Sequence, residues 1–332
     1  MKAITYTRYG GPDVLTLTDV PAPTPRDNEI LVRVRATSVT AGDWRARSLK
    51  MPPGFGVMAR PVFGLFGPRK KILGTELSGD VVAVGSKVAK FKVGDAVFAL
   101  VGMRFGSYAE LTAIPEHIAI ALKPANISYE EAAGLSFGGM TALDFLRRAK
   151  VKAGETILVN GASGGVGVAV VQIAKQMGLT VTAVTSGPNA TLLASLGAGR
   201  VIDYTQQDFA TLGESWDHVM DCVGNITLDG AAPVIRKGGT LMVVAGPLGS
   251  LFEAGKAKKL GIRLVAGPAA ELPADAKRLA ELAATGAYRT VIDRVYPLEQ
   301  AAEAHRYVHT GRKRGSVILT VGQGAAARLA AA

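Results

Sequence analysis

The chain has 332 residues, enough for about two domains of ordinary size. Hydrophobic residues make up 48% of it and charged residues 20%, which excludes an intrinsically disordered protein and supplies a sizeable core. The 38 Lys and Arg outnumber the 27 Asp and Glu, and the net charge of +11 favours anionic ligands without identifying one. A single cysteine, Cys222, excludes an internal disulfide framework and a Cys-rich zinc lobe.

No part of the chain predicts a membrane span or a targeting segment. No apolar run approaches the ~18 residues that a transmembrane helix needs. The N-terminus alternates like a first strand and has no apolar core behind a basic start. We therefore expect a cytoplasmic protein with no membrane partner. We also expect no nucleic-acid partner, because no recognition motif accompanies the basic run at residues 312–314.

The first third of the chain is rich in predicted strands. Apolar, β-branched runs over residues 29–36, 78–84 and 96–101 alternate with Gly, Pro and Asp turns, which predicts a small barrel. Between residues 49 and 73 lies an apolar segment broken by Pro and Gly. A segment of that length is either a pocket wall or lid, or a surface excursion that packs on itself, and the sequence leaves both open.

The pattern changes near residue 127. Ser128 and Glu131 have capping-box spacing and predict a helix start, Gly138 and Gly139 interrupt that helix, and residues 141–150 predict a second one. From there strands alternate with helices, which predicts a doubly wound parallel sheet with right-handed crossovers. The expected elements are the strands 156–160, 180–185, 200–202, 218–222 and 240–245 and the helices 166–177 and 190–196. Two helices (275–284 and 298–309), a strand near residue 291 and a last strand (316–321) end the pattern.

The most specific motif follows the strand 156–160. A glycine turn leads into an amphipathic helix, and Ala162-x-Gly164-x-x-Gly167 matches the dinucleotide-binding fingerprint with alanine in the first position. In this turn Gly164 lets the backbone approach a pyrophosphate, and Gly167 lets the helix lie close to the strand. The helix N-terminus adds free N–H groups and a positive dipole end.

The next strand bears on which nicotinamide cofactor is bound. NAD-binding versions of the motif place Asp or Glu at the end of the second strand, where it holds the ribose hydroxyls. This chain has no acidic residue between Glu155 and Asp203, and residues 185–187 are Thr, Ser and Gly. Hydroxyl and backbone N–H groups bond a 2′-phosphate that a carboxylate would repel, so NADP(H) is favoured.

Few residues suggest metal or acid–base chemistry. His305 and His309 are one helical turn apart, a spacing that suits a metal, but without an intervening carboxylate we expect a solvated helix face. Asp43, Glu76 and Asp221 lie near predicted strand ends, and each is either functional or a structural hydrogen-bond acceptor.

Taken together, these motifs resemble the medium-chain dehydrogenases/reductases, and among them the zinc-independent quinone oxidoreductase-like members. The likeness covers nearly the whole chain. Its most specific segments are SVTAGDWRARS, GTELSGDVVAVG, GSYAEL, GASGGVG, SLGAGRVIDY and YPLEQAAEAHRYVHTGRKRGSVIL.

The resemblance implies an α/β fold of two domains. A GroES-like catalytic domain would consist of residues 1–125 together with 270–332, and a Rossmann NADP-binding domain of residues 126–269, with the active site in the cleft. Members of the family commonly dimerise through the edge strand, here residues 263–266, so a homodimer is expected.

The resemblance also implies which residues bind NADPH. The pyrophosphate would be held by Ser163 to Val166, which lie in the turn formed by Ala162, Gly164, Gly165 and Gly167. The 2′-phosphate would be held by Ser186. Further cofactor contacts are expected from Thr141, Tyr204, Val223, Ala245, Gly246 and Arg314. Many relatives have Arg or Lys where this chain has Pro188, and that difference weakens the preference for NADP.

Zinc-containing members of the superfamily carry Cys, His-Glu and Cys ligands. The matching stretches here read Thr40-Ala41-Gly42-Asp43 and Gly74-Thr75-Glu76, so we expect no catalytic zinc. The acceptor would then be one that needs little polarisation, such as a quinone or an α,β-unsaturated carbonyl. Asp43, Thr75 and Tyr108 are the candidate proton sources, with solvent as an alternative.

Two other functions remain open on the sequence. One is a zinc-free, NADP-dependent alcohol or aldehyde oxidoreductase. The other is a catalytically silent protein that binds NADPH.

Overall fold

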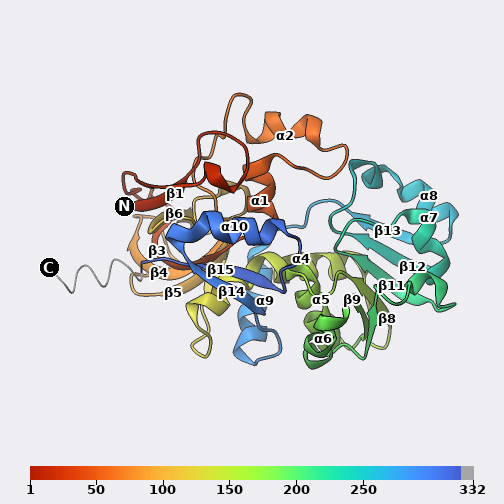
Figure 1. The fold of residues 1–332 in the computed structure, drawn as a ribbon. Helices are drawn as coiled ribbons and strands as arrows, with labels where there is room; N and C mark the ends of the chain where they lie inside the picture. The colour runs from red at the N-terminus through yellow and green to blue at the C-terminus, as the bar shows by residue number, and fades with distance from the viewer. Residues whose placement is uncertain (323–332) are drawn as a thin grey trace. The chain divides into compact units, whose positions relative to one another are not determined.

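The computed structural model describes residues 1–322, so the end of the predicted C-terminal segment, 323–332, lies outside the described residues. It consists of two compact units. The first contains residues 1–50, 58–137 and the segment that begins at 271, and the second contains residues 51–57 and 138–270. Figure 1 shows the elements of both.

The first unit is built on a seven-stranded sheet of order β14-β15-β3-β4-β5-β7, with β6 also paired to β3. Its pairs are antiparallel except β14 with β15. The strands are β3 (Glu29–Ser38), β4 (Glu76–Val84), β5 (Ala96–Leu100), β6 (Leu111–Pro115), β7 (Ala119–Leu122), β14 (Ile292–Pro297) and β15 (Ser316–Thr320), beside the pair β1 (Lys2–Thr5) and β2 (Thr16–Asp19). Helices of this unit are α1 (Ala41–Ser48), α3 (Tyr129–Ala133), α9 (Pro273–Ala284) and α10 (Ala301–His309), and α2 (Gly56–Phe63) and α4 (Ser136–Ala149) cross its boundary with the second unit.

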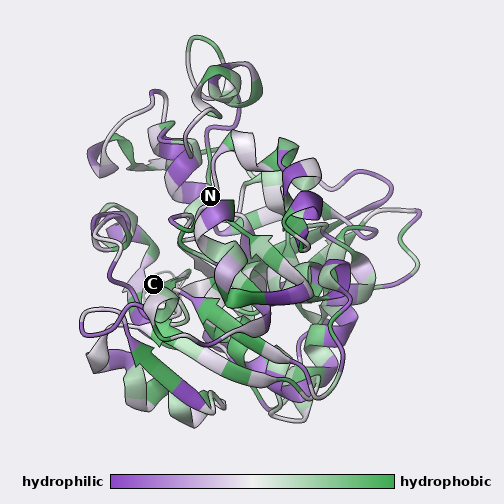
Figure 2. Ribbon diagram, turned by 90° about the vertical axis from the view of Figure 1, so that its right-hand side faces the viewer, coloured by the Kyte–Doolittle hydropathy of each residue, from purple (hydrophilic) through white to green (hydrophobic). Residues whose placement is uncertain are grey.

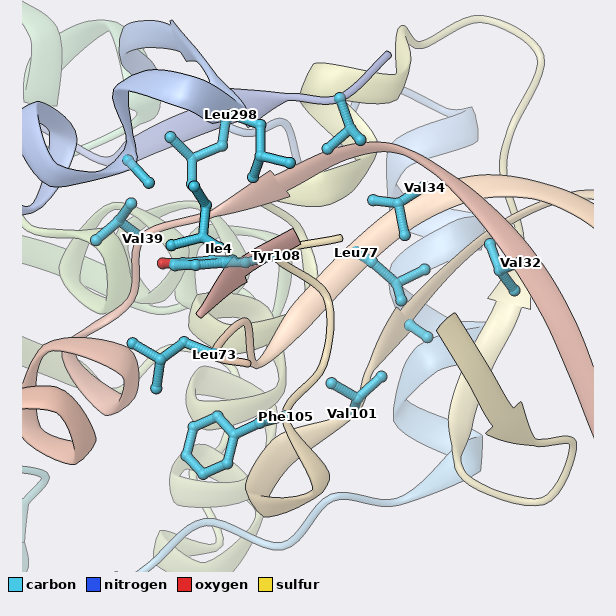
Figure 3. Packing of buried hydrophobic residues seen from close by; sticks show 14 of the residues in the cluster. Ile4, Val32, Val34, Val39, Leu73, Leu77, Val101, Phe105, Tyr108 and Leu298 are labelled. Atoms are coloured by element: carbon cyan, nitrogen blue, oxygen red, sulfur yellow. The ribbon is translucent and has the colours of Figure 1, made fainter. Parts of the chain in front are cut away.

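A continuous apolar core lies inside the first unit. Alternate residues of β3, such as Ile30, Val32 and Val34, are almost completely buried, as the period of two in its sequence requires. Leu77 and Tyr108 pack into the same cluster (Figure 3). This core fixes the start of α1, where Asp43 lies, and the loop after residue 73, where Thr75 lies.

The second unit is a six-stranded parallel sheet of order β10-β9-β8-β11-β12-β13. Its strands are β8 (Thr156–Asn160), β9 (Thr180–Thr185), β10 (Arg200–Asp203), β11 (Trp216–Asp221), β12 (Ile235–Val243) and β13 (Arg263–Ala266), and its further helices are α5 (Gly165–Gln176), α6 (Ala190–Leu196), α7 (Leu228–Ala231) and α8 (Ala254–Lys259). Hydrophobic residues follow the strands (Figure 2). The strand order reverses between β8 and β11, and dinucleotides bind at the carboxyl ends of strands at such a point. The predicted Rossmann sheet is confirmed.

Two boundaries differ from the sequence analysis. Residues 126–137, expected to open the Rossmann domain, belong to the first unit, because α3 packs on β3 and β4 and Ser78 Oγ donates to Tyr129 O at 2.6 Å. The capping box of Ser128 and Glu131 is confirmed at the start of α3. The expected break at residues 138–139 is wrong, since α4 runs through both. A Cβ on Gly138 would lie 2.4 Å from Gly165 O, so close packing explains this glycine.

Among residues 1–322, no helix is both long enough and apolar enough to cross a bilayer.

Candidate functional site

The glycine turn after β8 has the geometry that the fingerprint predicts. Gly161 adopts a φ of +76°, and Gly164 caps α5 with no side chain to accept from the first-turn N–H groups. A Cβ on Gly164 would meet a single atom, Gly161 O, at an ordinary contact distance of 3.5 Å. A Cβ on Gly167 would lie 2.3 Å from Gly161 O and 2.6 Å from Ala162 Cα. Gly167 therefore allows the helix to contact the strand, and Gly164 leaves its backbone accessible to a ligand.

A cluster of hydroxyl groups lies beside this turn. Thr185 Oγ1 donates to Ser163 Oγ at 3.0 Å. The Asn189 amide nitrogen lies 3.1 Å from Ser186 Oγ, 3.3 Å from Thr185 Oγ1 and 3.4 Å from Ser163 Oγ. The predicted residues Ser163 and Ser186 are thus brought together. The sequence analysis missed Asn189, although an amide in the loop after the second strand was the available signal.

The same loop also has a carboxylate beside it. The Asp203 carboxylate accepts a hydrogen bond from the Gly187 N–H, and its Oδ1 accepts from Thr205 N at 2.9 Å. The hydrogen bonds from Thr205, with that from Gly187, lower the pKa of Asp203, so it is ionised at neutral pH. The sequence argument covered only the residues between Glu155 and Asp203, so it did not include the Asp203 carboxylate itself. Asp203 pairs in register with Thr185, because the carboxyl ends of parallel neighbours meet at one edge.

Buried polar groups hold the ends of β8 and β11. Asp221 is completely buried and accepts from Asn160 Nδ2 at 2.9 Å, from Val223 N and Gly224 N at 3.0 Å each, and from Ile226 N at 2.9 Å. Of the two readings open for Asp221, the structure supports a structural acceptor. By fixing the loop after β11, it leaves the Val223 side chain 54% exposed.

The remaining predicted cofactor residues lie in different surroundings. Ala245 and Gly246 follow β12, and the Ala245 carbonyl lies 2.5 Å from where a Cβ on Gly224 would be. Thr141 is buried in α4, and the Tyr204 side chain after β10 is 62% exposed. Arg314 belongs to the first unit, where its backbone N–H and its guanidinium both face the Asp293 carboxylate, at 2.9 Å and 3.7 Å.

In the first unit, Asp43 brings together two threonines. It is the N3 residue of α1 and forms a capping box with Thr40, whose N and Oγ1 donate to it at 3.0 and 2.7 Å. Gly74 N and Thr75 Oγ1 donate to the same carboxylate at 2.9 and 3.2 Å, and the Thr40 and Thr75 hydroxyls are 2.9 Å apart. Burial raises the pKa of Asp43 to about 6, although these four donors act in the opposite direction. Asp43 therefore orients both hydroxyl groups.

Tyr108 lies deeper, in a chain of buried polar groups. Its hydroxyl is 3.3 Å from Ser38 O and 3.2 Å from His305 Nε2. Arg47 Nε donates to His305 Nδ1 at 3.2 Å, so the proton of the neutral imidazole is on Nε2, and Tyr108 donates to Ser38 O. Burial and then the charge of Arg47 lower the pKa of His305 to about 3. The expected solvated face is wrong for His305, which is fully buried, whereas His309 is exposed.

A second buried carboxylate, Glu76, lies next to this region. Glu76 Oε1 accepts a hydrogen bond from Ser38 Oγ, and Oε2 accepts from Phe137 N at 2.7 Å. Burial raises its pKa to about 7, even though these hydrogen bonds and the charge of Lys313 act in the opposite direction. The carboxyl therefore titrates near neutral pH.

This shift predicts how stability depends on pH. The pKa of Glu76 rises from 4.5 in the unfolded chain to about 7 in the fold, so the folded state binds the proton more tightly. Its contribution to the free energy of unfolding is therefore largest below pH 4.5 and falls as the pH rises to about 7. In urea melts, the free energy of unfolding of the wild type minus that of Glu76→Gln is expected to decrease as the pH rises across that window. A constant difference would contradict the shift.

No group of three or more His, Cys, Asp or Glu side chains within residues 1–322 is placed to hold a metal ion. The two positions that match zinc ligands in the superfamily are Thr40 and Thr75, whose hydroxyls bond each other and Asp43. Neutral threonine hydroxyls are not among the thiolate, imidazole and carboxylate ligands of zinc, and the matching Glu76 carboxylate bonds Ser38 and Phe137, so these positions do not fit the ion.

Two family models match the chain. The alcohol dehydrogenase GroES-like domain matches residues 26–124, and the zinc-binding dehydrogenase model matches residues 196–319. The chain is 34% identical to the 2-methylene-furan-3-one reductase of Solanum lycopersicum, over 96% of this chain and 79% of that protein. It belongs to the quinone oxidoreductase-like family of the medium-chain dehydrogenase/reductase superfamily.

Two further comparisons agree with this family. The chain is 32% identical to the chloroplastic NADPH-dependent alkenal/one oxidoreductase of Arabidopsis thaliana, over 96% of this chain and 79% of that protein. A solved structure of the quinone oxidoreductase from Coxiella burnetii superimposes with a TM-score of 0.85 at 30% identity, covering 97% of this chain and 99% of that one. The predicted fold and family are confirmed.

Proposed function

We propose that this member of the quinone oxidoreductase-like family is an NADPH-dependent oxidoreductase that reduces quinones or α,β-unsaturated carbonyls without zinc. The observation that carries the proposal is the start of α5 at Gly164, which has no side-chain cap and lies next to the Ser163 hydroxyl cluster. The tomato, Arabidopsis and Coxiella relatives are named for activities of this class. We also propose a cytoplasmic homodimer that pairs through β13, an edge strand of its sheet.

The residues of the second unit fit a dinucleotide. When bound, NADPH supplies the hydride. The first-turn N–H groups of α5 would hold the pyrophosphate, because they are free of side-chain caps and carry the positive end of the helix dipole. Ser163, Ser186 and Asn189 would bond the ribose and its 2′-phosphate through hydroxyl and amide groups.

In the first unit, Thr40 and Thr75 are the residues we propose to meet the acceptor oxygen. Their hydroxyls are held by Asp43, and reorientation of the Thr75 hydroxyl would let it donate to a developing oxyanion. Asp43 and Tyr108 have their hydrogen bonds made within the fold, so we propose that solvent supplies the proton and that these two residues position the site.

The test is steady-state turnover with NADPH and a panel of quinones, enones, simple alcohols and aldehydes. Oxidation of NADPH by quinones or enones supports the proposal. Turnover of alcohols or aldehydes alone would instead establish the zinc-free alcohol oxidoreductase. Tight NADPH binding without oxidation by any acceptor would establish a catalytically silent protein.

Cofactor preference gives a separate prediction on Ser186 and Asp203. Because Asp203 is ionised beside the loop that holds Ser186, Asp203→Asn is expected to tighten NADPH binding by about tenfold and to change NADH binding little. Ser186→Asp adds a like charge and is expected to weaken NADPH binding by at least about tenfold. Fluorescence titration with both cofactors measures these affinities. Equal changes for NADPH and NADH in both variants would contradict the proposed 2′-phosphate site.

A further inference from the structure

The first unit carries an exposed apolar group that the proposed function does not use. It consists of four side chains on α2 and the turn after it, here named the apolar tip. These side chains are Met58, Val62, Leu65 and Phe66. Phe66 is fully exposed, and the other three are between 46% and 54% exposed. Isolated exposed apolar residues are common, but four within nine positions form a patch that marks an interaction site.

The helix beneath the tip is anchored by its other face. Ala59 is buried, and Phe63 packs against the core with its ring 6.4 Å from that of Phe105. Ala59 and Phe63 are one turn apart, as are Met58 and Val62, so α2 packs the first apolar pair inward and leaves the second apolar pair exposed.

The turn that carries Leu65 and Phe66 is held in place by hydrogen bonds from two side chains. Tyr9 Oη donates to Gly64 O at 2.9 Å, and Arg60 Nη1 donates to Leu65 O at 2.9 Å. Gly64 has a φ of +136°, and a Cβ there would lie 2.0 Å from Gly67 O. These contacts fix the backbone of the turn, so Leu65 and Phe66 can contact a partner without further ordering of the chain.

The segment that carries the tip has basic residues but no acidic ones. The chain has no acidic residue between Asp43 and Glu76, and seven Lys and Arg lie in that interval. Arg60, Arg69, Lys70 and Lys71 are exposed. Among the ion pairs of residues 1–322, none includes Arg69, Lys70 or Lys71.

We propose that the apolar tip docks on the surface of an anionic lipid bilayer. A membrane interface offers an apolar layer for the four side chains and phosphate groups for the flanking cations, and peripheral anchors combine these two features. The exposed charged residues of this segment are all basic, so they favour a bilayer with an anionic surface. The expectation of no membrane partner rested on the lack of a spanning segment, and a peripheral contact needs none. The inference does not depend on the proposed function, since vesicle binding is measured without turnover.

The experiment is flotation of the full chain with two kinds of vesicle. One consists of phosphatidylcholine alone, and the other contains about one third phosphatidylglycerol, an anionic lipid. The wild type is expected to float with anionic vesicles, and less so in high salt, which screens exposed charges. Leu65→Ser with Phe66→Ser, and separately Lys70→Glu with Lys71→Glu, are each expected to weaken binding by about tenfold or more. Matched controls are Phe252→Ser, which alters another exposed phenylalanine, and Lys258→Glu with Lys259→Glu, which makes the same charge change in the second unit. Both controls are expected to bind within about twofold of the wild type.

Several outcomes would overturn the proposal. They are no flotation with anionic vesicles, equal losses in tip and control variants, or binding to neutral vesicles that salt does not change. A change of oligomeric state in Leu65→Ser with Phe66→Ser, without a loss of flotation, would instead assign the tip to a second copy of the chain. Because the substituted side chains are exposed, unchanged thermal melts and cofactor affinity are the check that each variant is folded.

Discussion

Replacing Gly167 with alanine is expected to destabilise the second unit by about 3 kcal/mol and to abolish cofactor binding. The new Cβ would lie 2.3 Å from Gly161 O and 2.6 Å from Ala162 Cα, and both neighbours are backbone atoms that no rotamer change can move. Alanine gains about 1 kcal/mol over glycine inside a helix, which is smaller than the steric cost. Urea unfolding and NADPH titration measure the two effects.

Gly164→Ala is the matched control because it adds the same methyl group three residues earlier. Its Cβ meets no atom closer than 3.5 Å, so the free energy of unfolding is expected to change by at most about 1 kcal/mol. The methyl group would occupy the space that we assign to the pyrophosphate, so NADPH affinity is expected to fall by about tenfold or more. Full NADPH affinity in Gly164→Ala, or full stability in Gly167→Ala, would contradict the assigned roles.

Local patterns predicted the second unit well. The bounds of β8, β9 and α6 agree with the sequence analysis residue for residue, because each apolar run ends at a turn. The course of α4 through Gly138 and Gly139 was not predictable in this way. There Gly138 serves a tertiary contact with Gly165 O, which outweighs its low helix propensity.

The candidate site shows the same limit of sequence reasoning. The glycine turn and Ser163 could be predicted because they are consecutive in the chain. Asp203 was missed because it reaches the loop after β9 from the neighbouring strand, a relation that depends on strand order. The burial of His305 depends on its contacts with Arg47 and Tyr108, which are far away in sequence.

Asp43→Ala is expected to destabilise the first unit by about 3 kcal/mol or more, because four donors lose their acceptor inside the fold. Asp43→Asn keeps one acceptor oxygen and removes a carboxylate whose pKa burial raises to about 6. These two effects oppose each other, so the free energy of unfolding of Asp43→Asn is expected to fall by only about 1 kcal/mol.

The kinetics of the two Asp43 variants separate positioning from proton donation. If Asp43 acts by orienting Thr40 and Thr75, then Asp43→Asn should retain most of kcat. In the same case, Thr75→Val should lower kcat while leaving NADPH affinity unchanged. If Asp43 itself donates the proton, Asn and Ala should lose kcat equally, and the pH profile of the wild type should lose a limb near its pKa of about 6 in both variants. We expect the first pattern, because the Asp43 carboxylate is completely buried and already accepts hydrogen bonds from four donors within the fold.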